Sequence, residues 1–254
     1  MAQQERAVRT RRAVVEAAAA VFAERGYAAA TIAEILERAD VTKGALYFHF
    51  GSKEALARGV IDAQITADYW VPRELKLQEL VDICMTLAHR IPRDVVLMAG
   101  IRLSADVQGR ELFGSAWPAW TELVTAKVTE AKEQGEVLRH IDPRETAEFV
   151  LGAWLGMQYL SEAYADWADL PERASTLFRY VLPAIATPAA LVSLDIAPDR
   201  GLRVIEEAGR QAAQPQPQPQ PQPESRPESQ PRPEAQSRPG SQSQSRPEPQ
   251  PAAG

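Results

Sequence analysis

With 254 residues, the chain is long enough for one or two domains with buried cores. Its formal net charge of −6 argues against nonspecific coating of nucleic acid, although an acidic total still allows a local basic surface. The single cysteine, Cys84, excludes an intramolecular disulfide framework and a cysteine-based zinc site. No apolar run approaches the roughly 20 residues that span a bilayer, and the charged N-terminus lacks a signal core. We therefore expect a cytoplasmic protein.

Helical periodicity runs through nearly all of the chain up to about Gly209, and strand-like alternation with hairpin turns is absent. The first predicted helix covers residues 8–25 and ends at Gly26, which suits a left-handed stop. Thr31 and Glu34 have the spacing of a capping box, which predicts the start of a second helix. The sequence therefore predicts an all-α protein.

The next residues predict two short helices after a tight turn. The turn is Ala39-Asp40-Val41, and Thr42 then caps a third helix that runs to about Phe48. Ser52 caps a fourth helix, which we expect to extend as far as Gln64. Two short helices, a tight turn and a newly capped helix are the layout of a helix-turn-helix DNA reader.

Later helices are predicted at residues 75–91, 93–107, 118–136, 144–166 and 171–186. Asp142-Pro143-Arg144-Glu145 is a clear helix start, with an N-cap, a proline in first position and an acid in third. The helix at 144–166 is apolar on nearly every side, so it must bury two faces. We expect helices 144–166 and 171–186 to form a homodimer interface; the alternative is a helix buried wholly inside one chain.

These patterns divide the chain into three parts. Residues 1–52 form a three-helix helix-turn-helix domain, and residues 53–209 form a C-terminal helical domain for ligand binding and dimerisation. Residues 210–254 form a tail of Pro, Gln, Ser, Glu and Arg, with little apolar side chain and few backbone donors. We expect this tail to be disordered, with polyproline-II character, and solvated rather than docked.

Residues around the third predicted helix have the chemistry of a reader of double-stranded operator DNA. Thr42 and Lys43 lie at its N-terminus, where a hydroxyl, an ammonium and free backbone amides favour phosphate. Gly44 and Ala45 leave room for close approach to the groove. An arginine-rich arm at residues 6–12 suits the minor groove. The candidate DNA-binding residues are Arg6, Arg9, Thr31, Thr42, Lys43, Gly44, Ala45, Tyr47, His49 and Lys53.

The large side chains at residues 46–50 are assigned two different roles, contact with DNA and packing against the rest of the domain. Tyr47 and His49 are expected to reach the DNA backbone or base edges. Leu46, Phe48 and Phe50 are expected to anchor the helix to the first and fourth helices.

Residues 6–56 resemble the DNA-binding domain of the tetracycline-repressor (TetR) family. The matched pattern is F-x-x-x-G-Y, T-x-x-x-I, A-x-V-T-K-G-A-L-Y-x-H-F and K-E-x-L, in that order. The chain departs from the family at Asp40, where a glycine is usual in the turn. Aspartate tolerates positive φ better than most residues, so we expect the turn to survive at a small cost.

Over roughly residues 5–208 the chain resembles one branch of that family, the γ-butyrolactone (autoregulator) receptors of antibiotic-producing bacteria. The motifs are VTKGALYFHF, AGIRLS at 99–104, WPAWTE and LPAIAxP at 182–188. The resemblance implies a repressor of antibiotic-biosynthetic or regulatory genes that a small lactone or butenolide relieves. It also implies a tryptophan that closes the ligand pocket, best matched by Trp120 with Trp117 as the competing assignment, and a polar pocket position at Gln64.

An apolar cavity lined by aromatic residues, with a few amides and hydroxyls for polar contacts, suits such a ligand. A filled core of the same residues is the alternative interpretation. The candidate ligand-binding residues are Gln64, Met98, Leu103, Phe113, Trp117, Trp120, Thr121, Trp154, Met157, Gln158 and Ser161. The fourth helix, with Lys53 near the DNA and Gln64 near the pocket, is the expected lever between the two sites.

Two other functions compete with this one. An enzyme is not expected, because the three histidines, His49, His89 and His140, form no catalytic or metal-binding motif and no phosphate-binding glycine loop occurs. No catalytic residue, metal or cofactor is therefore assigned. The remaining alternatives are a regulator that answers to an antibiotic or biosynthetic intermediate, and a regulator with no small-molecule effector.

Overall fold

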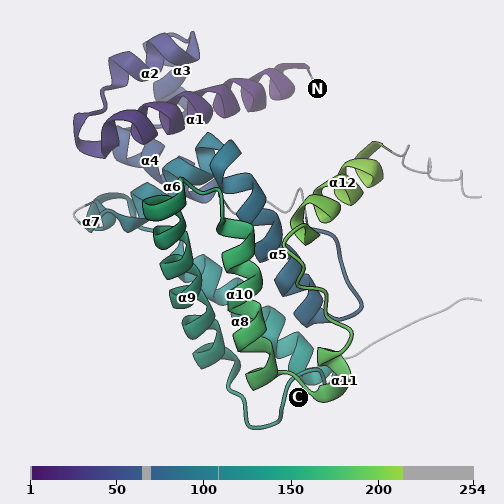
Figure 1. Ribbon diagram of the computed structural model, residues 1–254. Helices are drawn as coiled ribbons and strands as arrows, with labels where there is room; N and C mark the ends of the chain where they lie inside the picture. Colours follow the sequence, from purple (N-terminus) through teal and green to yellow (C-terminus); the bar gives the residue numbers. More distant parts are fainter. Residues whose placement is uncertain (1, 65–69, 108, 214–254) are drawn as a thin grey trace, which may run out of the picture. The chain divides into compact units, whose positions relative to one another are not determined.

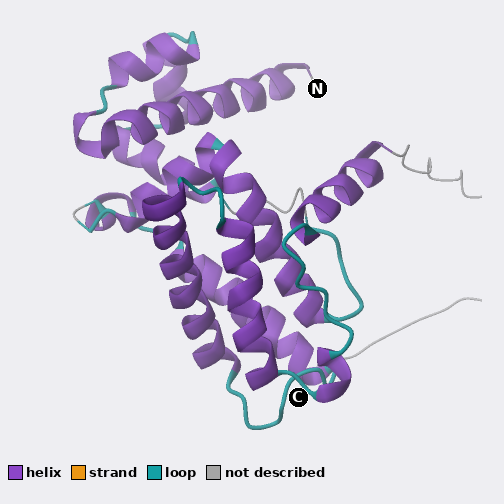
Figure 2. Ribbon diagram, in the orientation of Figure 1, coloured by secondary structure: helices purple, strands orange, loops and turns teal. Residues whose placement is uncertain are grey.

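A computed structural model describes residues 2–64, 70–107 and 109–213, and helices account for most of them (Figure 1). No β-strand occurs in these ranges, as Figure 2 shows, so the all-α prediction is confirmed. The helices are α1 (Ala2–Ala29), α2 (Ile32–Ala39), α3 (Lys43–His49), α4 (Lys53–Asp62), α5 (Lys76–Arg90), the 3₁₀ turn η1 (Ile91–Arg93), α6 (Val95–Ala105), α7 (Arg110–Phe113), α8 (Trp117–Glu133), α9 (Pro143–Ala165), α10 (Leu170–Ile185), α11 (Pro188–Leu191) and α12 (Arg200–Ala213).

Several boundaries differ from the sequence prediction. The first helix begins at Ala2 rather than at residue 8; the predicted break at Gly26 is present, with φ 73°, and a short helical turn continues beyond it to Ala29. Gln64 lies just beyond the end of α4 rather than on the helix. Residues 210–213, assigned to the tail, belong to α12. The predicted disorder of the rest of the tail lies outside the described residues.

The predicted helix starts are confirmed in the N-terminal helix-turn-helix domain, called the reader domain below (residues 1–52), and at the start of α4 that follows it. The Thr31 N–H donates to the Glu34 carboxylate at 3.0 Å, and the Glu34 N–H donates to the Thr31 hydroxyl at 3.2 Å, which completes the capping box. The hydroxyls of Thr42 and Ser52 accept from the first turns of α3 and α4. Each cap satisfies a backbone donor that the helix itself leaves unpaired, so these hydroxyls determine where each helix begins.

The turn between α2 and α3 adopts the conformation expected of it. Asp40 has φ 50° and ψ 48°, in the left-handed region, and its N–H donates to the carbonyls of Leu36 and Glu37 at the end of α2. Glycine enters this region without the steric cost that a side chain adds. The turn is therefore formed, with some strain at one residue.

Substituting Asp40 with glycine is expected to raise the free energy of unfolding by about 0.5–1 kcal/mol, because it removes that strain. Asp40→Ala, which keeps a side chain but loses the polar group that tolerates positive φ, is expected to lower it by about 1 kcal/mol. Urea denaturation of the two variants measures both effects. Equal stability of the glycine and alanine variants would contradict the assignment of strain to this turn.

The core of the reader domain corrects one expectation. Leu46 and Phe50 are buried as predicted, but Phe48 is 82 % exposed and anchors nothing within the described residues. The reason is the helical period: Leu46 and Phe50 are four residues apart and share a face, whereas Phe48 is rotated by about 200° from Leu46. Phe48 therefore belongs to the outer surface of α3.

Helix α5 is held at its start by a residue from far along the chain. Both carboxylate oxygens of Glu136, in the loop after α8, accept backbone N–H groups at 2.8 Å from Lys76 and Leu77. The residue before the helix, Leu75, provides no side-chain cap. Glu136 is itself buried, so this contact fixes the start of α5 against the end of α8.

Helix α12 packs against α5 through a buried ionic network. The Asp82 carboxylate accepts hydrogen bonds from Arg73 at 2.6 Å and from Arg200 at 2.7 and 2.8 Å. Arg73 also pairs with both oxygens of Glu207, on α12. A Cβ added to Gly201 would lie 2.1 Å from a backbone oxygen of α5, so the glycine allows the two helices to approach closely. The sequence analysis did not predict this contact.

Candidate DNA interface and internal cavity

The N-terminal end of α3 is open to solvent. Thr42, Lys43 and Gly44 are exposed, and Ala45 is half-buried. A Cβ added to Gly44 would have no neighbour within 4 Å among the described residues outside its own helix backbone, so this point of the helix is uncovered there. The free amides of a helix N-terminus carry partial positive charge, which favours a phosphate there.

Three residues on one face of α3 are well placed to enter a groove of DNA. Gly44, Tyr47 and Phe48 follow at helical spacing, and the last two are exposed. The Lys43 ammonium lies 5.9 Å from the centre of the Tyr47 ring, and His49, half-buried, contacts Phe48 edge to face. Phe48 is the residue of this face that the sequence analysis missed, although the helical period alone would have placed it there.

Lys53 is held at the junction of α4 with the end of α1. Its ammonium lies 3.4 Å from the Ala28 carbonyl and 4.5 Å from the centre of the Tyr27 ring. The Tyr27 hydroxyl donates to Glu54 at 3.1 Å; burial, reinforced by this carboxylate, raises the pKa of Tyr27 to about 12. The other predicted DNA contacts, Arg6, Arg9 and Thr31, are exposed on the same domain.

Helix α6 connects the reader domain with the C-terminal helices. The Arg102 guanidinium donates to the Ala23 carbonyl of α1 at 2.9 Å and pairs with Glu162 of α9 at 2.8 Å. A Cβ on Gly100 would lie 2.3 Å from the Gln64 side chain, so the glycine makes room for that amide. The backbone and side chains of α6 therefore touch α1, the end of α4 and α9.

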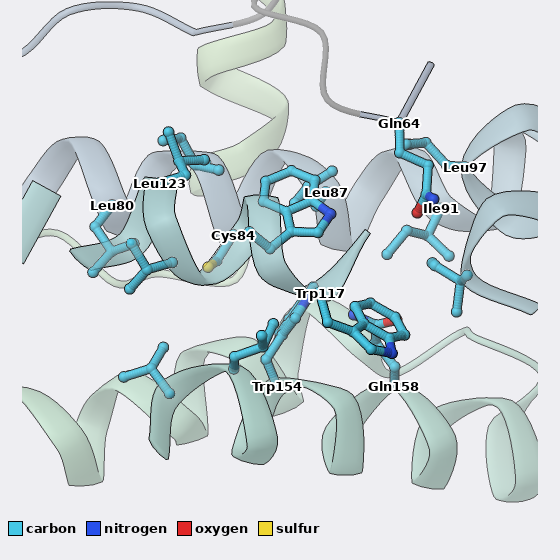
Figure 3. Close-up of a pocket in the computed structure, with 16 residues that line it drawn as sticks. Gln64, Leu80, Cys84, Leu87, Ile91, Leu97, Trp117, Leu123, Trp154 and Gln158 are labelled. Carbon is cyan, nitrogen blue, oxygen red and sulfur yellow. The ribbon is translucent and has the colours of Figure 1, made fainter. Parts of the chain in front are cut away.

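An internal cavity lies between α5, α6, α8 and α9 (Figure 3). The space between its wall atoms measures about 620 Å³, including the mouth, but the centre of a water molecule fits into only about 40 Å³. The lining residues are Gln64, Leu80, Ile83, Cys84, Leu87, Ile91, Leu97, Ile101, Trp117, Trp120, Leu123, Val124, Val150, Leu151, Trp154 and Gln158. The cavity is thus a narrow apolar slot with room for a few water molecules, and a larger molecule would press on its walls.

Five of the predicted ligand-binding residues meet in this cavity. They come from three parts of the chain: Gln64 after α4, Trp117 and Trp120 on α8, and Trp154 and Gln158 on α9. Both tryptophans proposed to close the pocket are part of its wall. The apolar residues of α5 and α6 were not predicted, because at helical spacing they are indistinguishable from ordinary core positions.

The other six predicted residues lie outside the cavity wall, contrary to expectation. Phe113 packs against Tyr27, with ring centres 4.6 Å apart, and Met157 lines an outer groove between α9 and α10. The Thr121 hydroxyl donates to the Trp117 carbonyl, and that of Ser161 to Asp169, so both are already paired. Met98 and Leu103 are also absent from the wall. Five of these six residues lie on α6, α8 and α9, which border the cavity, but the rotation of each helix decides which residue faces it.

Cys84 lies in the cavity wall, and burial raises the pKa of its thiol to about 12. Because a raised pKa keeps the thiol protonated at pH 8.5, we expect the native protein to resist iodoacetamide for hours. Unfolding in urea should restore ordinary labelling, measured as a single added mass on the intact chain. Equal labelling rates for the native and unfolded chains would contradict the burial of this thiol.

The described residues contain neither a metal-binding cluster nor a membrane-spanning helix. No group of His, Cys, Asp or Glu side chains there could hold a metal ion. Among the same residues, no helix is long and apolar enough to cross a membrane.

The capped helices, the open face of α3 and the exposed arginines of the same domain define a helix-turn-helix DNA-binding protein. The family model described as bacterial regulatory proteins, tetR family, matches residues 14–60. The A-factor receptor protein of Streptomyces griseus is 40 % identical over 195 residues, which cover 76 % of this chain and 70 % of that protein. The chain belongs to the TetR family of bacterial transcription regulators.

Solved structures agree with this assignment. Full-length TylP, a TetR regulator from Streptomyces fradiae, is 39 % identical with a TM-score of 0.75, covering 80 % of this chain and 99 % of TylP. A γ-butyrolactone receptor described as an ArpA-like protein is 26 % identical with a TM-score of 0.55, covering 81 % of this chain and 97 % of that receptor. The chain is therefore a DNA-binding transcriptional regulator similar to the A-factor receptor, as its sequence predicted.

Proposed function

We propose that this regulator is a repressor that leaves its operator when a small γ-butyrolactone or butenolide binds, and that it controls antibiotic or other secondary-metabolite genes. The similarity to receptors of that name supports the ligand class. The observation that carries the proposal is the apolar cavity, whose wall includes Gln64, two residues after the helix that begins with Lys53. The site of the signal and the DNA interface thus adjoin the same short helix.

The DNA contacts follow from the exposed surface of the reader domain. We place α3 in the major groove, with Gly44 allowing close approach and Tyr47 and His49 directed to backbone or base edges. Lys43 and Lys53 supply phosphate contacts on either side. A pseudo-palindromic operator requires two copies of this domain at a fixed separation, so the effector need only change that separation to release the DNA.

A homodimer through α9 and α10 would supply the second copy. Phe149, Tyr159, Tyr164 and Tyr180 are each at least 65 % exposed on these helices, an unusual density of uncovered aromatic surface. Val150, Trp154 and Gln158 of α9 are buried on the opposite side of that helix. The helix therefore buries one apolar face within the chain, and we assign the exposed aromatic residues on its other sides to a partner copy.

Substituting Gly152 of α9 with arginine is expected to raise the dimer dissociation constant at least tenfold. A Cβ at Gly152 would meet nothing within 4 Å in the single chain, so the variant should fold, but the long cation would enter the proposed interface. Sedimentation velocity measures the association, and circular dichroism checks the fold. A folded variant that dimerises like the original chain would place the interface elsewhere.

The narrowness of the cavity suggests how the signal reaches the DNA. A lactone with an alkyl chain needs more room than a few water molecules, so it would displace wall residues such as Leu97 and Ile101, both on α6. The same helix carries Gly100, against which Gln64 packs, and Arg102, which holds the end of α1. Movement of α6 would therefore be passed to α1 and α4, so a bound ligand favours a different placement of the reader domain.

The test begins with an operator selected from random duplex DNA by the full-length protein. Release of that operator is then followed by gel shift while synthetic γ-butyrolactones, butenolides and a panel of antibiotics are titrated separately. Release by a lactone or butenolide at micromolar concentration supports the proposal. Release by antibiotics alone would favour a receptor for an antibiotic or intermediate, and release by none of them would indicate a regulator without such an effector.

A further inference from the structure

The described residues of the cavity wall carry no charge. None of its sixteen residues is Asp, Glu, Lys, Arg or His, and its polar side-chain groups are the amides of Gln64 and Gln158, the indole N–H groups and one thiol. An anionic group that enters such a wall loses its hydration and gains no counter-charge, which is strongly unfavourable. The wall therefore favours a neutral ligand.

One of the two amides has an unused acceptor. Gln158 is 4 % exposed, and its side-chain oxygen has no hydrogen-bond partner among the described residues. It lies on α9 one turn after Trp154, and Figure 3 shows both side chains at the cavity. A buried acceptor without a donor is costly, so a molecule that brings a donor to this point gains more than an ordinary hydrogen bond.

The second amide is already engaged. The Gln64 side-chain nitrogen donates to the Ile61 carbonyl at 3.2 Å, and the side chain packs against Gly100. Its donor therefore serves the end of α4. The unsatisfied hydrogen-bonding atom in the described cavity wall is therefore the acceptor Gln158 Oε1.

From these observations we propose that Gln158 is a specificity residue: it selects a neutral effector that donates a hydrogen bond to its Oε1. Resting on the proposed function, this means a ring-closed lactone that carries a free hydroxyl. Hydrolysis adds water to the ring carbonyl and breaks the ring C–O bond, giving an alcohol and a carboxylate and releasing a proton at neutral pH. That anion would meet no cation among the described wall residues, so opening the ring ends the signal.

The test compares three probes on the full-length protein at pH 7 by isothermal titration calorimetry. They are an alkyl γ-butyrolactone with one free hydroxyl, its O-methyl ether and its alkali-opened hydroxy acid. The hydroxyl lactone is expected to bind at least about tenfold more tightly than the ether, because the ether cannot donate. The open acid is expected to bind at least about a hundredfold more weakly than the closed ring. Equal affinity for alcohol and ether, or for ring and acid, would overturn the proposal.

The variant Gln158→Met has a side chain of similar length but lacks the acceptor. It distinguishes the effect of the hydrogen bond donated by the ligand hydroxyl from the effect of the ligand's size. In it the alcohol and the ether should bind equally; a preference for the alcohol that persists would trace to the size of the added methyl group and overturn the proposal. In the matched variant Gln64→Met the preference should remain tenfold or more, and its disappearance there would move the acceptor to Gln64 and also overturn the proposal.

The melting temperature of the unliganded protein tests the role of Gln158 independently of the proposed effector class. The unliganded Gln158→Met protein is expected to melt at a higher temperature than the original chain, because an unpaired buried acceptor has been removed. A lower melting temperature would mean that the protein already satisfies this oxygen, and would refute the role of Gln158. Failure of every lactone to bind would refute the proposed effector class, while the melting temperature still decides the role of Gln158.

Discussion

Replacing Gly44 with leucine is expected to weaken operator binding at least about a hundredfold, close to 2.7 kcal/mol, without harming the fold. A Cβ added at Gly44 has no neighbour within 4 Å among the described residues outside its own helix backbone, and leucine is a better helix former than glycine, so stability should stay the same or rise. The same side chain would stand between α3 and the groove and hold the whole interface away from the bases. Fluorescence anisotropy with the selected operator measures the affinity, and thermal melting measures the stability.

The matched control is Gly209→Leu, the same substitution at an exposed glycine of α12 that also has no neighbour within 4 Å. It should leave operator affinity unchanged. If Gly44→Leu bound operator as tightly as this control, α3 would not be the helix that enters the groove.

Replacing Asp82 with alanine is expected to lower the free energy of unfolding by about 3–5 kcal/mol. The carboxylate is almost fully buried and accepts from both Arg73 and Arg200, so its loss leaves two guanidinium groups in the interface without their shared partner. Glu207 still pairs with Arg73, but nothing replaces Asp82 between the two arginines. Urea denaturation followed by circular dichroism measures the change.

Asp199→Ala is the control, because Asp199 pairs with Arg203 at the surface of the same helix junction, where both side chains are largely exposed. Solvent screens such a pair, so its loss should cost less than about 1 kcal/mol. Similar losses for the two variants would mean that the Asp82 network contributes no more than an ordinary surface ion pair.

The reader domain could be predicted closely because its determinants are local. The caps at Thr31, Thr42 and Ser52 act within three residues of themselves, and the left-handed turn at Asp40 depends on one residue type. Such signals are complete within a short window of sequence. The one local error, Phe48, came from treating alternate residues as one face, where the helical period of 3.6 applies.

The C-terminal domain could be predicted only in outline because its determinants are distant in sequence. Asp82 lies within an otherwise apolar pattern, and its partner Arg200 is 118 residues away, so no local pattern marks the pair. The cavity depends on the rotation of four helices. The step from Gln158 to Met157 is a single residue, yet it turns the side chain by about 100°, from the cavity to the outer groove. Composition identifies such helices without fixing their rotation.

The cap that Glu136 places on α5 has a consequence for how the protein is made. As the chain leaves the ribosome, the contacts of the reader domain, such as Tyr27 with Glu54, are available once about a quarter of the chain has been synthesised. Helix α5 must wait for Glu136 to secure its start and for Arg200 to neutralise Asp82. A nascent chain is therefore expected to hold a folded DNA-binding domain well before α5, which forms one side of the internal cavity, is fixed in place.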